Sequence, residues 1–328
     1  PYVRSLSYSF VNLTNVWFLI FPWNLTIDWA LGSLPGGLIE SIWDGRMLAV
    51  LAIASSLLLL VTELPAREDR LPVLLGMALM IIPFIPSSNL FFPVGFLWAE
   101  RVLFTPSAGF CILMAVVFQK ARGMVGVGAN WKRALLPAIL LCLYAVRTLR
   151  RNADWRDGYT LYQSAVDVLP LSARNHHGIG TVYSHDVDQL DRAEQHFRKA
   201  FELLPVYGET INSLALLLSK QPGREEEAKD LYREAVRVTP GLNRPSLNLA
   251  GLLVDMNVGP NVNMTEVAEA ERLYRDASML PMMTVDKRYD TFVRLGSICL
   301  KQGKFRAAAE AFQNAVALQD HVQDGTAL

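Results

Sequence analysis

Acidic residues are scarce in the first half of this sequence. The chain has 328 residues and 31 Asp or Glu, but only seven of these acids occur before residue 152. Long stretches there carry no charge of either sign, for example 71–99 and 102–119. Apolar runs of this length favour membrane-spanning helices over the buried helices of a soluble domain.

Cysteines, basic runs and catalytic motifs are also few or missing. The three cysteines, Cys111, Cys142 and Cys299, cannot form a closed disulfide framework, and we expect buried thiols. No basic run marks a nucleic-acid surface, so that class of partner is not predicted. There is no Walker A, HExxH or CxxC motif. The adjacent His176 and His177 lack the third and fourth ligands of a metal site, so no metal is predicted either.

Four apolar segments predict a polytopic membrane domain over residues 1–152. The expected spans are about 47–62, 71–85, 102–119 and 134–149. The second ends where three prolines between 83 and 93 interrupt the helix pattern. The fourth is short for a bilayer core, which takes roughly 17–25 residues, so we expect the three arginines within 147–151 to snorkel to the interface.

Loop charge predicts the orientation of these spans. Loop 120–133 carries four basic residues and no acid, which indicates the cytosolic side. The alternation of spans then places 86–101 and the C-terminal half on the opposite side, although the arginines within 147–151 argue against it. Three Asn-x-Thr sequons, at Asn12, Asn24 and Asn263, fall on that opposite side and predict glycosylation in the endoplasmic reticulum lumen.

The uncharged segment 5–27 is the ambiguous part of this half. It contains asparagines and a proline, so we interpret it as an amphipathic helix on the lumenal surface rather than a fifth span. All seven tryptophans precede the complete repeats, most of them at the ends of apolar stretches. That placement is typical of an interfacial aromatic belt.

A different pattern begins at Trp155 and recurs about every 34 residues, the period of the tetratricopeptide repeat. A half repeat at 155–170 precedes complete repeats at 171–205, 206–240, 241–281 and 287–320. Each repeat places Gly or Ala in its first half and an aromatic residue in its second, as in Gly180 and Phe197. We expect the small residue to let two helices approach and the aromatic ring to fill the adjoining space. The predicted fold class is therefore all-α, a multi-span helical membrane domain followed by an α-solenoid over 153–328.

Such a solenoid presents the first helix of each repeat along a concave groove. The predicted groove residues are Arg174, His177, Thr181, Asn212, Leu216, Arg244, Leu247 and Ser297. They do not form the Lys and Asn set that clamps a C-terminal carboxylate. The groove is thus either a polypeptide-binding surface or plain solvent-exposed surface.

Two places in the membrane half carry candidate chemistry. Glu100 and Arg101 stand between apolar stretches, where an ionisable group is costly unless paired or functional. Arg101 suits the phosphate of a lipid-linked sugar, since guanidinium binds phosphate through two hydrogen bonds. The alternative is that Glu100 and Arg101 only fix helix ends at the interface. Asp28, between aromatic residues, and Asp44 are candidate general bases, with loop acids or helix caps as the alternative.

The segments FPWNLTIDW and PFIPSSNLFFPVGFLWAERVLFTPS, with the change into repeats at NADW, resemble the transmembrane and tetratricopeptide repeat-containing proteins. The resemblance covers essentially the whole chain. Members of that family are endoplasmic reticulum O-mannosyltransferases of cadherins. The resemblance implies transfer of mannose from dolichyl-phosphate-mannose to Ser or Thr hydroxyls of cadherin-type domains, with no bound cofactor and with membrane lipid as a partner.

This resemblance maps onto Asp28 with Trp29 and onto Glu100 with Arg101, which become the candidate catalytic and donor-phosphate residues. Relatives place an acidic catalytic residue in a first lumenal loop, which is expected upstream of Pro1. The opening Pro-Tyr-Val-Arg without an initiating methionine predicts a fragment. The residues alone equally allow a non-catalytic membrane adaptor whose repeats tether proteins.

Overall fold

The computed structural model describes residues 2–27, 29, 38–63, 70–88, 97–124, 130–257, 262–279 and 283–323. Within these ranges the regular structure is helical, apart from a single β-bridge between Trp29 and Trp98. The all-α prediction is therefore confirmed. The chain divides into two compact units, residues 1–175 and 176–328, each described here by itself.

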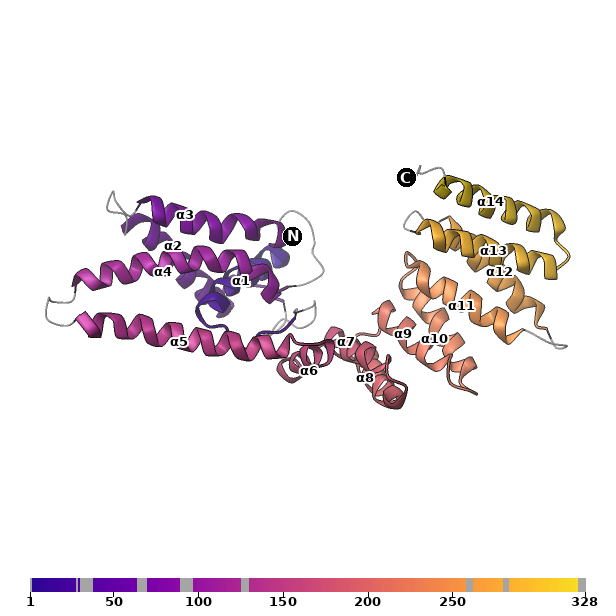
Figure 1. Cartoon of the computed structure of the whole chain (residues 1–328), viewed down its shortest axis with the longest axis horizontal. Helices are drawn as coiled ribbons and strands as arrows, with labels where there is room; N and C mark the ends of the chain where they lie inside the picture. The colour runs from indigo at the N-terminus through magenta and orange to yellow at the C-terminus, as the bar shows by residue number, and fades with distance from the viewer. Residues whose placement is uncertain are drawn as a thin grey trace. The chain divides into compact units, whose positions relative to one another are not determined.

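Unit 1 holds the apolar helices. They are α1 (Tyr2–Ile20), α2 (Arg46–Glu63), α3 (Arg70–Ile81), α4 (Phe104–Met124), α5 (Asn130–Asp154) and α6 (Gly158–Val168) (Figure 1). Two 3₁₀ turns adjoin α3 and α4, namely η1 (Ile82–Ser87) and η2 (Glu100–Leu103). The change from α to 3₁₀ at η1 follows from Pro83 and Pro86, which lack the N–H that an α-helix requires.

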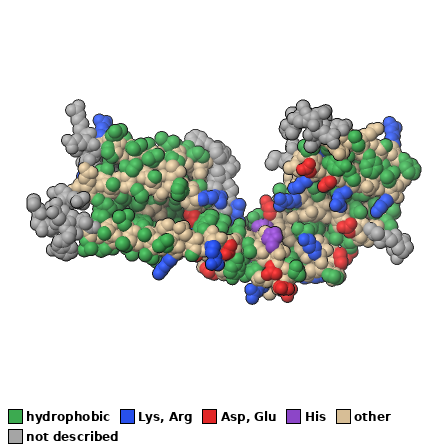
Figure 2. All heavy atoms as spheres, viewed as in Figure 1, with side chains coloured by type: hydrophobic (Ala, Val, Ile, Leu, Met, Phe, Trp, Pro, Cys, Tyr) green, Lys and Arg blue, Asp and Glu red, His purple; other side chains and the backbone are tan. Residues whose placement is uncertain are grey.

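All four predicted spans are helical, but they differ in how well they suit a bilayer. Among the described residues, two stretches are long and apolar enough to cross a membrane, Arg70–Ser87 and Glu100–Lys120. In α2 only Arg46–Ser56 qualifies, as a shorter apolar helix. Figure 2 shows hydrophobic side chains over much of the visible face of unit 1. Two membrane helices are thus indicated by length and composition, and four crossings stay a prediction.

Helix α1 buries one face of its surface. Ser7, Val11, Asn15 and Leu19, spaced four residues apart, are all less than 9% exposed, whereas Trp17 is 49% exposed. This spacing places the four side chains on one side of the helix. Helix α1 packs against α2. Its predicted position on the membrane surface is not tested by these contacts.

Helices α3 and α4 cross through two glycines. A Cβ atom on Gly109 would lie 2.6 Å from the backbone nitrogen of Met80, and one on Gly76 would lie 2.9 Å from the side chain of Leu113. Only hydrogen atoms fit at this crossing. Close approach through small residues is the usual way in which apolar helices pack in lipid.

Unit 2 consists of helix pairs. The helices are α7 (Ala173–Tyr183), η3 (Val187–Gln189), α8 (Leu190–Leu203), α9 (Gly208–Leu218), α10 (Glu225–Val238), α11 (Asn243–Met256), α12 (Met264–Ser278), α13 (Val285–Lys301) and α14 (Phe305–Gln323). Each predicted complete repeat contains one pair, and α6 lies in the predicted half repeat. The contact-based boundary falls inside α7, at 175/176, whereas the sequence places the boundary at 152/153. Residues 153–175 group with unit 1, where Asn175 Nδ2 donates to the carbonyl of Ala165 at 2.9 Å.

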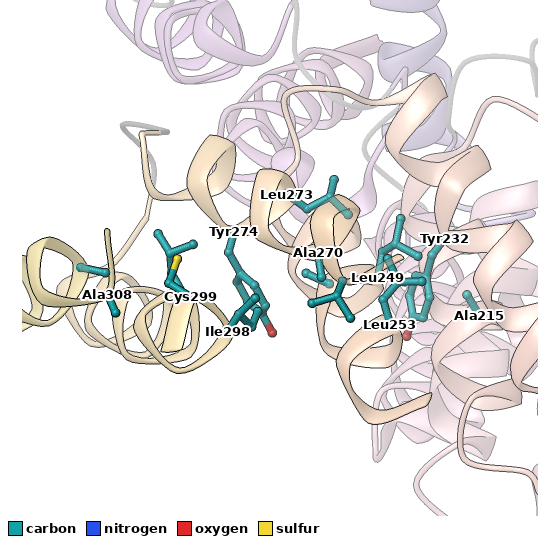
Figure 3. Packing of buried hydrophobic residues seen from close by; sticks show 14 residues of the cluster. Ala215, Tyr232, Leu249, Leu253, Ala270, Leu273, Tyr274, Ile298, Cys299 and Ala308 are labelled. Atoms are coloured by element: carbon teal, nitrogen blue, oxygen red, sulfur yellow. The ribbon is translucent and has the colours of Figure 1, made fainter. Parts of the chain in front are cut away.

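A continuous apolar core runs through the last three repeats. Figure 3 shows its members side by side, from Ala215 and Tyr232 through Tyr274 to Ala308. In the first repeat a Cβ on Gly180 would lie 2.9 Å from the Phe197 ring, so the expected pairing of small residue and aromatic ring is confirmed.

The cysteine prediction is correct for one thiol and wrong for two. Cys299 is buried in the repeat core, but Cys111 and Cys142 are exposed. The two exposed thiols lie on α4 and α5, and the described helices cover only part of the apolar surface of each. Apolar sequence surroundings therefore do not imply burial inside the protein.

Candidate functional site

Two distant segments that carry the family resemblance meet in unit 1. Trp29 and Trp98 form an antiparallel bridge, in which Trp29 N donates to Trp98 O at 2.7 Å and Leu97 N donates to Trp29 O at 2.6 Å. Their rings pack edge to face, with centroids 5.1 Å apart and an interplanar angle of 88°. The bridge holds segment 22–29 against the start of η2.

Trp98 also fixes α1 to this junction. Its indole Nε1 donates to Val11 O at 2.7 Å, and the edges of Phe10 and Phe18 pack against it at 6.3 and 6.1 Å between centroids. The side chain is only 3% exposed. Trp98 is therefore a core residue of unit 1 and not part of an interfacial belt, whereas Trp23 and Trp43 are exposed.

Glu100 lies beside this junction in a network of hydrogen bonds. Arg151 Nε donates to Glu100 Oε2 at 2.9 Å, and Trp155 Nε1 donates to Glu100 Oε1 at 2.7 Å. Arg151 Nη1 continues the network to Asp154 Oδ2 at 3.0 Å and Ser164 Oγ at 2.9 Å. The network joins η2 to the end of α5 and to α6.

The expectation that the arginines at the end of α5 snorkel is wrong for Arg151. This residue is only 7% exposed, because it pairs with Glu100 inside unit 1. Arg147 Nε donates to Pro22 O at 2.8 Å. Arg150 is exposed. The pairing of Glu100 with Arg151 and Trp155 was not predicted. The signal that could have revealed it was a lone acid in an apolar stretch, which needs a cationic partner.

The geometry of Glu100 suits positioning better than proton transfer. Its carboxylate accepts hydrogen bonds from a guanidinium and an indole, and its side chain is 11% exposed. Lone pairs that accept from protein donors are not available to a substrate hydroxyl. Arg101, next in the chain, is exposed and lies at the same edge. Its role at a donor phosphate remains a prediction.

The other two acids behave differently. Asp28 lies outside the described residues. Asp44 receives hydrogen bonds from Arg46, whose Nη2 donates to Asp44 Oδ2 at 2.6 Å, and these bonds lower the pKa of Asp44 to about 2. Arg46 begins α2, so the pair fixes the start of that helix. This matches the helix-cap alternative for Asp44.

The three sequons occupy different surroundings. Asn12 is half-buried within α1, and Asn24 is exposed with a φ of 54°. Thr26 of the second sequon is only 1% exposed. Asn263 is exposed and caps α12, where its Oδ1 accepts from Thr265 N at 3.1 Å. Of the three, Asn263 presents its side chain best to an enzyme.

In unit 2 the structure joins two predicted groove residues, Asn212 and His177, to partners that were not predicted. Asn248 Nδ2, on α11, donates to Asn212 Oδ1, on α9, at 2.9 Å. His177 Nδ1 lies 3.2 Å from Thr210 Oγ1, also between neighbouring repeats. The role of Asn248 depends on contact between the first helices of successive repeats. The pattern of a single repeat does not predict that contact.

The remaining predicted groove residues make no common cluster. Thr181 Oγ1 donates to the carbonyl of His177 within its own helix. Leu216, Ser297 and Arg244 are exposed, and Leu247 is half-buried. Arg174 belongs to unit 1 and is therefore not placed relative to the others.

Histidines gather in the first repeat without forming a metal site. His176 Nδ1 and His196 Nδ1 lie 2.9 Å apart, and the ring of Tyr183 stacks on His196 with centroids 5.6 Å apart. Burial and the neighbouring His176 lower the pKa of His196. In the part of the chain that the structure describes, no group of three or more His, Cys, Asp or Glu could hold a metal ion.

Comparison with known proteins gives matches at both ends of the chain. Residues 1–58 match the family model "Protein O-mannosyl-transferase TMTC, DUF1736", and residues 289–321 match the tetratricopeptide repeat model. Among solved structures, the crystal structure of MamA covers 53% of this chain and is covered to 94%, with a TM-score of 0.43 and 14% identity. A likeness that weak supports no argument here.

The relatives of known family cover between about half and nearly all of the chain. Protein O-mannosyl-transferase TMTC3 of Mus musculus is 32% identical over 98% of this chain and 35% of its own length. Protein O-mannosyl-transferase TMTC4 of Homo sapiens is 39% identical over 54% of this chain and 24% of its own length. The chain thus spans about a third of the length of the first of these relatives. Over that span, the chain belongs to the TMTC family of protein O-mannosyl-transferases.

Proposed function

We propose that this chain is part of a protein O-mannosyltransferase of the endoplasmic reticulum membrane. The observation that carries the proposal is the alignment with TMTC3 over 98% of the chain, through both the apolar helices and the repeats. Two helices of membrane length support a membrane location. Loop charge and the exposed Asn263 support a lumenal position for the repeats.

The proposed donor is dolichyl-phosphate-mannose and the proposed acceptor is a Ser or Thr hydroxyl of a cadherin-type domain. The new bond joins the acceptor oxygen to C1 of mannose, while the bond from C1 to the phosphate oxygen breaks. A base must take the hydroxyl proton, and a cation must stabilise the charge that develops on the phosphate. The proposed base is an acidic residue of a lumenal loop, as the family resemblance implies.

In unit 1, we assign the cation to Arg101 and the positioning role to Glu100. Arg101 is exposed at the edge where the chain enters α4, where a phosphate at the membrane surface can reach it. Glu100, held by Arg151 and Trp155, fixes the backbone from which the Arg101 side chain extends. Guanidinium can bind a phosphate through two parallel hydrogen bonds.

The experiment is mannose transfer by the full-length protein, measured from the intact mass of a cadherin domain made in cells with and without it. Arg101→Ala is expected to abolish transfer while expression and membrane insertion stay normal. Arg150→Ala, which removes an exposed arginine from α5, is the matched control and should transfer normally. Unchanged transfer by Arg101→Ala would remove this residue from the donor site. No added mannose even with the wild-type protein would favour a non-catalytic adaptor.

In unit 2, we assign the acceptor surface to the first helices of the repeats, around the half-buried Asn248, whose partner Asn212 is only 7% exposed. A side-chain amide offers both a donor and an acceptor, the same pair that a peptide group presents. The bond from Asn248 to Asn212 aligns the two amides across neighbouring repeats. This arrangement suits an extended polypeptide bound through its main chain.

The groove assignment is tested by kinetics against acceptor concentration. Asn212→Leu with Asn248→Leu should raise the KM for the acceptor domain by about tenfold, since lost main-chain hydrogen bonds weaken binding, and leave kcat unchanged. Arg237→Ala is the control, because the Arg237 side chain is 73% exposed and forms its ion pair with Glu234 of its own helix. An unchanged KM in the double variant would place acceptor binding elsewhere.

A further inference from the structure

A small internal cavity lies at the junction of α1, segment 22–29 and η2. It is enclosed by residues of all three parts of unit 1, namely Asn15, Phe18, Leu25, Thr26, Trp29, Trp98, Ala99, Glu100 and Leu103. Its volume is about 10 Å³.

Two buried polar atoms at this cavity have no hydrogen-bond partner among the described residues. Asn15 Nδ2 donates to Val11 O at 3.0 Å, but in that part of the chain Asn15 Oδ1 accepts no hydrogen bond, and Thr26 Oγ1 makes none. Asn15 is 4% exposed and Thr26 is 1% exposed. Both residues line the same cavity although they come from different segments.

The chemistry of the two atoms specifies what fits. The Asn15 oxygen can only accept a hydrogen bond, while the Thr26 hydroxyl can donate or accept. A group that satisfies both must donate at least one hydrogen bond and be very small. A cavity of about 10–15 Å³ holds one water molecule, which needs two to four polar partners. An ion has no counter-charge to spare here, because Glu100 is already paired with Arg151.

We propose that this cavity is a binding site for one water molecule, which bridges Asn15 Oδ1 and Thr26 Oγ1. The water joins α1 to segment 22–29 directly beside Glu100. It therefore completes the junction that the Trp29–Trp98 bridge begins, and it holds α1 and segment 22–29 in one arrangement. If one of its two partners is removed, the water loses a hydrogen bond and binds the remaining polar atom less tightly.

The direction in which Thr26→Val changes the Tm tests this proposal. If the water is bound, Thr26→Val removes one of its partners, and the Tm of the purified full chain in detergent should fall by about 2–8 °C. If no water is bound, the same change removes a buried polar atom that lacks a partner, and the Tm should rise or stay constant. A rise or no change would overturn the proposal. Thr14→Val is the matched control, because Thr14 Oγ1 donates to Phe10 O within α1 and does not line the cavity.

A second variant and a direct observation guard against a variant that fails to fold. Asn15→Leu combined with Thr26→Val removes both polar partners, so the double variant should lose less Tm than the sum of the single variants. A high-resolution density map of the full-length wild-type protein should show a peak within hydrogen-bonding distance of Asn15 Oδ1 and Thr26 Oγ1. A map of that quality without a peak there would also refute the site.

Discussion

At the level of single residues, the buried charged side chains considered next each form an ion pair. Arg151 is 7% exposed and pairs with Glu100, while Lys229 is 6% exposed and pairs with Glu266. A charge taken from water without such a partner would destabilise the fold by several kcal/mol. These pairs therefore mark positions where a change in one side chain should be felt strongly.

Arg151→Met should lower the stability of unit 1 by about 3–5 kcal/mol, because Glu100 is then left buried without its guanidinium partner. The measurement is the free energy of unfolding of the purified chain in detergent, obtained from denaturant titration. Arg150→Met, at the adjacent exposed position, should change this free energy by less than about 0.5 kcal/mol. Equal effects of the two changes would show that the ion pair contributes little.

The histidine pair of the first repeat predicts a dependence of stability on pH. Burial and the neighbouring His176 lower the pKa of His196 in the folded chain below its ordinary value of 6.5. Its stabilising contribution is therefore fully present above pH 6.5 and is lost as the pH falls through the lowered value. The thermal midpoint of the repeats should drop between pH 7.5 and pH 5.

His196→Gln should reduce the drop in the thermal midpoint between pH 7.5 and pH 5. His185→Gln, at an exposed histidine of the same repeat, should leave that drop unchanged. Far-ultraviolet circular dichroism at a series of pH values would follow the midpoint. A decrease of the same size in the His196→Gln variant would assign the effect to other groups.

At the scale of elements, helices meet where one of them has almost no side chain. Gly109 lets α4 approach the backbone of α3, and Gly180 lets α7 approach the Phe197 ring of α8. The two units use the same device in different surroundings, one with apolar helices of membrane length and one with the amphipathic helices of a repeat.

Gly109→Ala should destabilise unit 1 by about 1–3 kcal/mol, because the new Cβ would lie 2.6 Å from the backbone nitrogen of Met80. Backbone atoms cannot move aside as a flexible side chain can, and this penalty outweighs the gain of about 1 kcal/mol in helix propensity. Gly45→Ala meets nothing within 4 Å and serves as the control. Thermal unfolding in detergent would distinguish the two; a Gly109→Ala chain as stable as the control would show that α3 and α4 can separate without penalty.

At the scale of the whole molecule, the second helices of the repeats are joined to one another by ion pairs. Arg224 pairs with Glu194, Arg233 with Glu269, and Lys304 with Glu271, each between neighbouring repeats. With the continuous apolar core, these contacts join each repeat to the next. A solenoid built in this way depends on neighbour contacts rather than on one central core.

The predicted membrane topology gives a test for the chain as a whole. In cells, Asn263 should carry an N-linked glycan, so Asn263→Gln should abolish a glycosidase-sensitive shift on a gel. Thr265→Ser keeps the sequon and should preserve the shift. In sealed microsomes the repeats should resist added protease until detergent is present. Digestion without detergent would place the repeats in the cytosol.

The repeats could be predicted in detail because their determinants are local. A small residue and an aromatic residue at fixed spacing, as in Gly180 and Phe197, specify a helix pair from one stretch of sequence. The spans of unit 1 were predicted as helices for the same reason, since apolar length is a local property.

Contacts between distant segments could not be predicted in this way. Nothing near Glu100 in the sequence indicates that Arg151 and Trp155 are its partners, and nothing near Trp29 indicates Trp98. Asn248 was missed because its partner Asn212 lies one repeat away.

The sequence by itself determined the helical character, the repeat period and the family to which the chain belongs, because each depends on residue types at short, regular spacing. Only the tertiary structure decided that Glu100 is bound by Arg151, that Trp98 is a core residue, and that Asn15 and Thr26 face one cavity. The physical reason is that burial and pairing are properties of neighbours in space. A chain that folds back on itself brings together residues that no local pattern connects.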